Sequence, residues 1–503
     1  MEQQLLQACG NGNVEEIQKL LQNSRININY REEKYGKTPI CIACSKGHIE
    51  VVKVLLNDKR IDINVTDFFG QTSLFISCQD IWNSEIIKLL LNKGIDINQA
   101  NQYGQTPLLI ACQQGHIEVV KILLNNEEID INKAHDNGTT PLFIACEKGY
   151  IQVLKTLLND ERVDVNKSDN SGQTPFYIAC HEGRIDIVKI LLNDERVNIS
   201  NLESKIGKIP FYIACTKGHI EVVKLLLNDE RIDINEANNN GTTPLYICCF
   251  DGQTEIVKLI LNDKRIDVNK SNNFGRTPFY IACYYRHIEI MKLLLNDKRV
   301  DIIKGNQNDA TPLYHACEKG YLDIVKLLLS DKIVKLLLDD QRVDVNLTNQ
   351  QSQTPLFIAC TFGSPEIVEN ILASGKEVNL TITNHRGKTA MDIARRNKED
   401  ENVEESQKIK GKWSMIVELL ESYEINPSET RSKLRKQLGL SCNIHFFSFL
   451  LLFFIYSLIP LFEKKKNKKI QKLLRYFVSL FFFVIITWNS RVQQLFKMVE
   501  IKK

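Results

Sequence analysis

The chain has 503 residues, with 64 Lys and Arg against 61 Asp and Glu, and its formal net charge is +3. A chain of this length exceeds one ordinary domain unless its core grows by the addition of repeated units. The opening Met1-Glu-Gln-Gln predicts no N-terminal signal peptide.

The charge is unevenly distributed along the sequence. From Arg431 onward there are 15 Lys and Arg against Glu463 and Glu500, a net charge of +13, so the first 430 residues carry about −10. An acidic body with a basic tail predicts no nucleic-acid partner for the body. The tail is of the kind that binds an anionic surface, such as a membrane.

From residue 38 a Thr-Pro pair, or a close copy of it, recurs about every 34 residues, which predicts a repeated supersecondary unit. In the unit beginning at Thr140, the threonine can cap a first helix over 141–148, and Gly149 ends that helix. Apolar residues from Ile151 to Leu158 predict a second helix, and a polar turn leads into the next unit. The units start at Thr38, Thr72, Thr106, Thr140, Thr174, Ile209, Thr243, Thr277, Thr311, Thr354 and Thr389.

A helix pair with an extended turn, a T-P-L start and a central Gly resembles the ankyrin repeat. The resemblance covers residues 1 to about 424 and implies an all-α repeat solenoid of about twelve stacked helix-turn-helix units with short β-hairpin-like turns. Residues 1–37 are then a degenerate N-terminal capping repeat and 38–388 are ten repeats. Residues 389–424 are a C-terminal capping repeat, with a charged insertion over about 395–412 and a helix over 413–423.

The sequence departs from the family pattern at two kinds of position. Most units replace the Gly that usually closes the second helix by Asn-Asp-x-Arg, as in Asn159 to Arg162. Residues 324–341 contain a nine-residue duplication, which lengthens one unit from 34 to 43 residues.

Cysteines recur at one position of the unit, where ankyrin repeats usually have a small Ala. Equivalent atoms of adjacent units lie about 10 Å apart, too far for a disulfide, so we interpret these cysteines as core residues of a protein from a reducing compartment. Cys41-Ile-Ala-Cys44 imitates a C-x-x-C motif, but no second pair follows, and we predict no metal or redox site there. The eleven aligned residues are Cys9, Cys44, Cys78, Cys112, Cys146, Cys180, Cys215, Cys249, Cys283, Cys317 and Cys360.

No catalytic constellation stands out from the repeat. Gly36-Lys37-Thr38 imitates the end of a phosphate-binding loop but lacks its first Gly, because Arg31 stands there. The recurring His48, His116, His219 and His287 are interpreted as structural. We therefore predict a protein that is not an enzyme and has no cofactor, metal or small-molecule substrate.

Aromatic residues interrupt the repeat at positions expected to be exposed. The polar pair at the end of the first helix, Glu147-Lys148 in one unit, becomes Tyr284-Tyr285 in another. We predict a partner-binding patch of Phe250, Phe274, Tyr284 and Tyr285 with Arg276 and Arg286, since aromatic residues and Arg dominate binding hot spots. The alternative, that these rings serve packing among themselves, stays open. A second aromatic series is interpreted as packing between units: Tyr177, Tyr212, Tyr246, Tyr280 and Tyr314.

The C-terminal region changes in character. Residues 425–440 are predicted as a basic linker, and 441–503 as a membrane-associated tail with apolar helices at 441–462 and 476–488 and a basic segment at 463–475. The positive-inside rule conflicts with a simple span by the first segment when the repeats are cytosolic. Two alternatives remain open. In one, the two segments enter and leave the same leaflet, and in the other, the tail has no function.

Together these patterns predict a cytoplasmic scaffold that binds a protein partner on the concave face of its ankyrin stack and is attached to a membrane through residues 441–488. Two alternatives remain at this point. One is a soluble ankyrin protein with a non-functional tail, and the other is the regulatory subunit of a membrane enzyme or channel.

Overall fold

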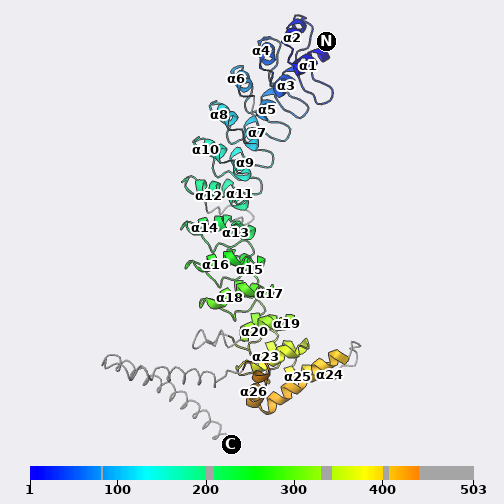
Figure 1. The fold of residues 1–503 in the computed structure, drawn as a ribbon, viewed down its shortest axis with the longest axis vertical. Coiled ribbons are helices and arrows are strands. Elements are labelled where there is room, and N and C mark those ends of the chain that lie inside the picture. The colour runs from blue at the N-terminus through cyan, green and yellow to red at the C-terminus, as the bar shows by residue number, and fades with distance from the viewer. Residues whose placement is uncertain (81–82, 200–208, 330–342, 400–406, 441–503) are drawn as a thin grey trace, which may run out of the picture. The chain divides into compact units, whose positions relative to one another are not determined.

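The computed structural model describes residues 1–80, 83–199, 209–329, 343–399 and 407–440 (Figure 1). The chain divides into two compact parts, Met1–Arg431 and Ser432–Lys503, and each is described by itself. Most of the duplication at 324–341 and the whole predicted tail, 441–503, lie outside the described residues. Within the described ranges, no helix is long and apolar enough to cross a membrane.

The described residues up to Ile425 form twelve successive helix pairs, and no strand is assigned among them. The first helices of the pairs are α1 (Glu2–Asn11), α3 (Pro39–Ser45), α5 (Ser73–Cys78), α7 (Pro107–Gln114), α9 (Pro141–Lys148), α11 (Pro175–His181), α13 (Pro210–Lys217), α15 (Pro244–Asp251), α17 (Pro278–Tyr284), α19 (Pro312–Lys319), α22 (Pro355–Thr361) and α24 (Ala390–Glu399). The second helices are α2 (Val14–Leu21), α4 (Ile49–Asn57), α6 (Ser84–Asn92), α8 (Ile117–Leu124), α10 (Ile151–Leu158), α12 (Ile185–Leu192), α14 (Ile220–Leu227), α16 (Thr254–Leu261), α18 (Ile288–Asn296), α20 (Leu322–Leu329), α23 (Pro365–Ala373) and α25 (Gln407–Ile425).

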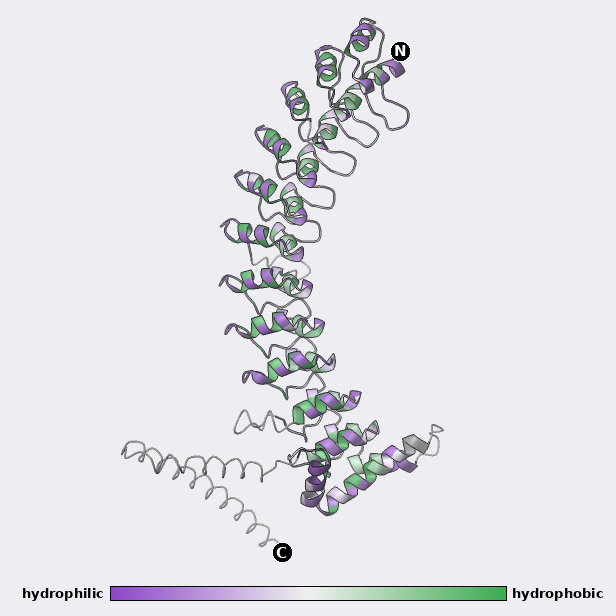
Figure 2. Cartoon of the chain, in the orientation of Figure 1, coloured by the Kyte–Doolittle hydropathy of each residue, from purple (hydrophilic) through white to green (hydrophobic). Residues whose placement is uncertain are grey.

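Each helix packs on its counterpart in the neighbouring unit. The first helix α15 contacts α13 and α17, and the second helix α16 contacts α14 and α18. Hydrophobic and hydrophilic residues share the same helices along the stack (Figure 2), because one side of each helix is covered by neighbours. The predicted all-α repeat solenoid is confirmed.

Threonine caps and buried cysteines recur through the stack as the sequence predicts. In the Thr277 unit the threonine Oγ1 accepts a hydrogen bond of 3.1 Å from the Tyr280 backbone N–H, whereas Ile209 provides no side-chain cap. All described cysteines are buried free thiols, and burial raises the pKa of thiols such as Cys112. Their place in the core is thereby confirmed.

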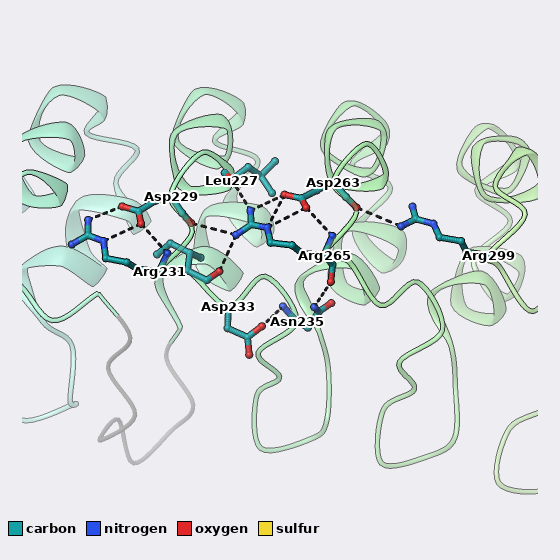
Figure 3. A network of polar contacts seen from close by, with 9 residues as sticks. Leu227, Asp229, Arg231, Asp233, Asn235, Asp263, Arg265 and Arg299 are labelled. Carbon is teal, nitrogen blue, oxygen red and sulfur yellow. Dashed lines mark hydrogen bonds and ion pairs between the residues drawn. The ribbon is translucent and has the colours of Figure 1, made fainter.

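The Asp-x-Arg segment acts as a clamp between units (Figure 3). Arg265 donates from Nη2 to the backbone carbonyl of Leu227, the last residue of α14, at 2.6 Å, and to Asp263 Oδ2 at 2.7 Å. The last carbonyls of a helix have no partner within the helix, so this Arg satisfies a group that would otherwise need water. Equivalent contacts to the end of a preceding second helix are made by Arg60, Arg162, Arg196, Arg231 and Arg299.

Asparagines form a second series of contacts between units. Asn235 donates from Nδ2 to the carbonyl of Arg265 at 2.8 Å, and its Oδ1 accepts from the Asp267 backbone N–H at 2.7 Å. The amide thus completes two backbone hydrogen bonds of the next unit. Asn132, Asn166 and Asn269 repeat the pair.

Acid should weaken the clamps. Hydrogen bonds from Arg265 hold the pKa of Asp263 below its ordinary value of 3.8, and five other clamp aspartates behave alike. A group whose pKa is lowered by folding makes its full contribution to stability at pH values above its unfolded-state pKa. That contribution is lost as the pH falls through its folded-state pKa. Thermal melts should therefore show Asp263→Asn less stable than the natural chain at about pH 7, with the gap narrowing as the pH falls below about 4. A gap that does not narrow below about pH 4 contradicts this prediction.

The C-terminal end is more helical than the sequence predicts. The predicted insertion over 395–412 is largely taken up by the ends of α24 and α25, because charged residues on an exposed helix face are good helix formers. The predicted basic linker, 425–440, contains helix α26 (Pro427–Gln437). The Asn426 Oδ1 accepts from the Glu429 backbone N–H at 3.2 Å, and Pro427 suits the first helical position.

Candidate partner-binding surface

The predicted aromatic residues of the Thr243 and Thr277 units touch one another. The ring centroids of Phe250 and Tyr285 lie 4.6 Å apart in an edge-to-face arrangement, and those of Tyr284 and Tyr285 lie 5.1 Å apart. The guanidinium of Arg276 lies 5.4 Å from the centre of the Tyr284 ring and 5.9 Å from that of Phe274. We call Phe250, Phe274, Arg276, Tyr284 and Tyr285 the aromatic patch.

The aromatic patch remains open to solvent although its rings touch. Phe250 is 37% exposed, Tyr285 45% and Phe274 56%. Phe250 lies near the end of α15, and Tyr284 and Tyr285 lie at the end of α17, where adjacent first helices pack side by side. Contact among the rings therefore covers part of their surface and leaves a contiguous aromatic area at the ends of two neighbouring helices.

Arg286, which directly follows Tyr285, has its contacts in the following unit. Its guanidinium pairs with Asp323 at 3.0 Å and lies 5.5 Å from the centre of the Tyr321 ring, both in the following unit. Its backbone φ of 61° is in the left-handed region, which most other units reach with Gly, as at Gly252. A non-glycine residue in that region costs about 1 kcal/mol, so this Arg is held in place by its contacts with the next unit.

The recurring histidines make contacts between units, and the recurring tyrosines bind the turn that follows them. His287 Nε2 lies 3.0 Å from the carbonyl of Phe250, and the other three histidines of the series make equivalent contacts. The hydroxyls of Tyr246 and Tyr280 accept from Asn272 and Asn306, in the turns that close their own units, at 3.2 and 3.0 Å. The predicted packing of the tyrosine series between units is seen at Tyr280, whose ring centroid lies 5.9 Å from that of His315 in the next unit.

A polar pocket, which the sequence did not predict, adjoins the aromatic patch. It is a cavity of about 370 Å³ lined by residues of three successive units. Arg276 and Tyr284 belong to both the patch and the pocket. The lining residues used below are Arg276, Tyr280, Tyr284, Ala310, His315, Glu318 and Lys319.

His315 is the unusual residue of the polar pocket. It is 5% exposed, and its ring stacks on Tyr284 with centroids 4.4 Å apart and an interplanar angle of 11°. Its Nδ1 lies 3.1 Å from a carboxylate oxygen of Glu318, and its Nε2 has no hydrogen-bond partner in the described part of the chain. The sequence does mark His315 as a departure from the repeat. The equivalent residue is Ile in the other Thr- or Ile-led units, including Ile281 and Ile358.

The protonation of His315 should make stability depend on pH. Burial, followed by the charges of Lys319 and Arg276, lowers the pKa of His315 to about 4 despite the nearby Glu318. A folded-state pKa below the unfolded value of about 6.5 means that the unfolded state binds the proton first, so stability falls as pH falls from about 6.5 towards 4. Between about pH 7 and pH 5, the free energy of unfolding of the natural chain should therefore fall by about 2 kcal/mol more than that of His315→Ile.

Urea unfolding of the two chains at both pH values measures this difference. The control His385→Ile replaces an exposed histidine and should keep the pH dependence of the natural chain. Identical pH dependence of the natural chain and His315→Ile contradicts the assignment.

Helix pairs, threonine caps and side-chain contacts between units define a solenoid of helix-turn-helix repeats that carries an exposed aromatic patch. The family model described as ankyrin repeats (3 copies) matches residues 2–67, 61–135, 128–201, 196–272, 264–333 and 330–405. The chain belongs to the ankyrin repeat family. No curated protein matches the chain. Ankyrin repeats are generally protein-interaction modules, and the family is typically non-enzymatic.

Proposed function

We propose that this chain is a scaffold that binds a protein partner through the aromatic patch, on the concave face of its ankyrin stack. The observation that supports the proposal most is the contact of Phe250, Tyr284 and Tyr285 in one exposed cluster. The equivalent residues of the Thr140 unit are Glu147 and Lys148, which are typical of a solvated surface.

The chemistry of the patch favours a protein partner. Tyr and Arg are enriched at binding hot spots because they offer a large contact area together with hydrogen bonds and charge. The Arg276 guanidinium lies within reach of two rings, so the cation and the aromatic faces are already arranged before binding. A surface prepared in this way loses little conformational freedom when a partner covers it.

The proposal includes a membrane tether formed by residues 441–488, with the repeats in the cytoplasm. It is supported by the sequence alone: residues 441–462 contain no Asp, Glu, Lys or Arg, and a lysine-rich segment follows. Extraction of cell membranes with alkaline carbonate tests it. We expect the full-length chain to stay in the membrane pellet and a chain ending at residue 430 to be released. Release of both chains would contradict the membrane tether.

Proximity labelling in cells tests the binding proposal. Labelling enzymes are fused to the full-length chain, to Tyr284→Ala/Tyr285→Ala and to the matched variant Glu147→Ala/Lys148→Ala. We expect the tyrosine variant to lose a defined set of labelled proteins that the matched variant keeps. Equal sets for all three chains would remove the patch as the binding surface.

A further inference from the structure

Three departures from the repeat meet in the polar pocket. His315 replaces the usual Ile, and Ala310 stands where the other units have Lys, Gln, Thr or Arg directly before the unit start. Tyr284, the third departure, forms a wall of the same cavity. One substitution alone would be ordinary variation, but these three line a single cavity of about 370 Å³.

Ala310 leaves a tyrosine hydroxyl without an acceptor. In the next unit, Gln353 occupies the position equivalent to Ala310, and the Tyr314 hydroxyl donates to Gln353 Oε1 at 3.0 Å. The Tyr280 hydroxyl accepts from Asn306 at 3.0 Å, but Ala310 cannot accept its proton, and no other acceptor is found among the described residues. The short side chain of Ala310 therefore opens space at a hydrogen-bond donor.

The charged residues of the polar pocket favour an anion. Arg276 and Lys319 contribute two positive charges, and Glu318, held beside His315, contributes one negative charge. The Nε–H of Arg276 is buried and has no hydrogen-bond acceptor in the described part of the chain. Positive charge thus exceeds negative charge in a space that lies at the small end of the usual range for ligand sites.

We propose that the polar pocket binds the carboxylate of an Asp or Glu side chain from the protein partner, with Tyr280 and Arg276 as hydrogen-bond donors. This inference rests on the proposed function. A protein source is favoured because Arg276 and Tyr284 belong to the pocket and the aromatic patch alike, so a chain that covers the patch brings its side chains to the pocket. A carboxylate accepts charge-assisted hydrogen bonds, which are stronger than neutral ones.

Selection of peptides tests the inference. A displayed library of random decapeptides is selected on the full-length chain, and the recovered peptides are measured by fluorescence anisotropy. We expect them to share an Asp or Glu whose replacement by Asn or Gln weakens binding by about tenfold or more. The Ala310→Gln substitution, which restores the repeat residue and fills the cavity, should weaken the same peptides by a similar factor.

Matched controls separate the polar pocket from general effects. Thr139→Gln makes the equivalent change in another unit and should leave the affinity unchanged. Recovered peptides without an acidic preference, no recovered peptide, or acidic peptides that bind Ala310→Gln as tightly as the natural chain overturn the inference. If a peptide with phosphoserine in place of the Asp or Glu binds more tightly than the acidic peptide, the pocket is a phosphate site and the carboxylate proposal is wrong.

The two proposals fail in different ways. In one outcome Tyr284→Ala/Tyr285→Ala loses its labelled proteins, Ala310→Gln keeps them all, and no peptide shows an acidic preference. That outcome supports the scaffold function and contradicts the carboxylate site. If the tyrosine variant loses no labelled protein, the aromatic patch itself falls.

Discussion

Replacement of Tyr284 and Tyr285 by Ala should weaken the binding of a partner identified by proximity labelling by about a hundredfold or more. The reason is that hot-spot aromatic residues each contribute about 2 kcal/mol or more when truncated, and about 1.4 kcal/mol is a factor of ten in affinity. Tyr285 contacts the ring of Phe250, and Tyr284 stacks on His315, so the double substitution removes the centre of the patch and a wall of the pocket. Isothermal titration calorimetry of purified chain and partner measures the effect.

The matched variant Glu147→Ala/Lys148→Ala changes the same positions of the repeat in another unit. It should bind within about twofold of the natural chain, since isolated exposed charges contribute little. A similar loss in both variants, or an affinity of the tyrosine variant close to that of the natural chain, contradicts the assignment of the patch. Circular dichroism of each variant shows whether it is folded.

Replacement of Phe279 by Ala should lower the free energy of unfolding by about 3–5 kcal/mol, because it removes a large side chain from a close-packed core. Phe279 is fully buried within α17, which packs between α15 and α19. In a repeat stack each unit is stabilised chiefly by its neighbours. The loss of stability should therefore be concentrated around the Thr277 unit. Unfolding should then proceed in more than one step.

Urea unfolding followed by circular dichroism measures the total loss, and hydrogen exchange locates it. The exposed Phe274 is a matched control in the adjacent turn, and Phe274→Ala should change stability by about 0.5 kcal/mol or less. A loss below about 1 kcal/mol for Phe279→Ala, or faster exchange spread evenly over all units, is incompatible with local coupling between units.

Much of the fold follows from the sequence because each unit repeats the same local signals. Threonine at the cap, Pro at the first helical position and apolar residues at helical spacing recur together, so each unit supports the assignment of the others. The Asp-x-Arg segment was recognised as a departure, but its role was not. Arg265 donates to a carbonyl 38 residues earlier, and that proximity exists only when the units are stacked.

The geometry of the candidate surface was predictable in part. Phe250, Tyr284 and Tyr285 break a polar position of the repeat, and such a break is visible without coordinates. The orientation of Arg286 towards Asp323 was not predictable, because it depends on the left-handed backbone at that residue.

The polar pocket was missed for a different reason. A small Ala310 carries no chemical signal of its own, and its effect appears only beside the Tyr280 hydroxyl of the same unit, whose proton has no acceptor among the described residues. His315 carries a signal in the sequence, since it replaces a recurring Ile, but a polar residue at a core position does not by itself indicate that it lines a cavity.

Site-specific photo-crosslinking tests the central claim, that the aromatic patch is the partner-binding surface, most directly. A photoreactive phenylalanine is placed at position 285 in one full-length chain and at the equivalent position 148 in another, and both are irradiated in cells. The account predicts a discrete crosslinked partner from position 285 that is absent or much weaker from position 148. Equal crosslinking from both positions, or a partner captured from position 148 alone, would contradict it.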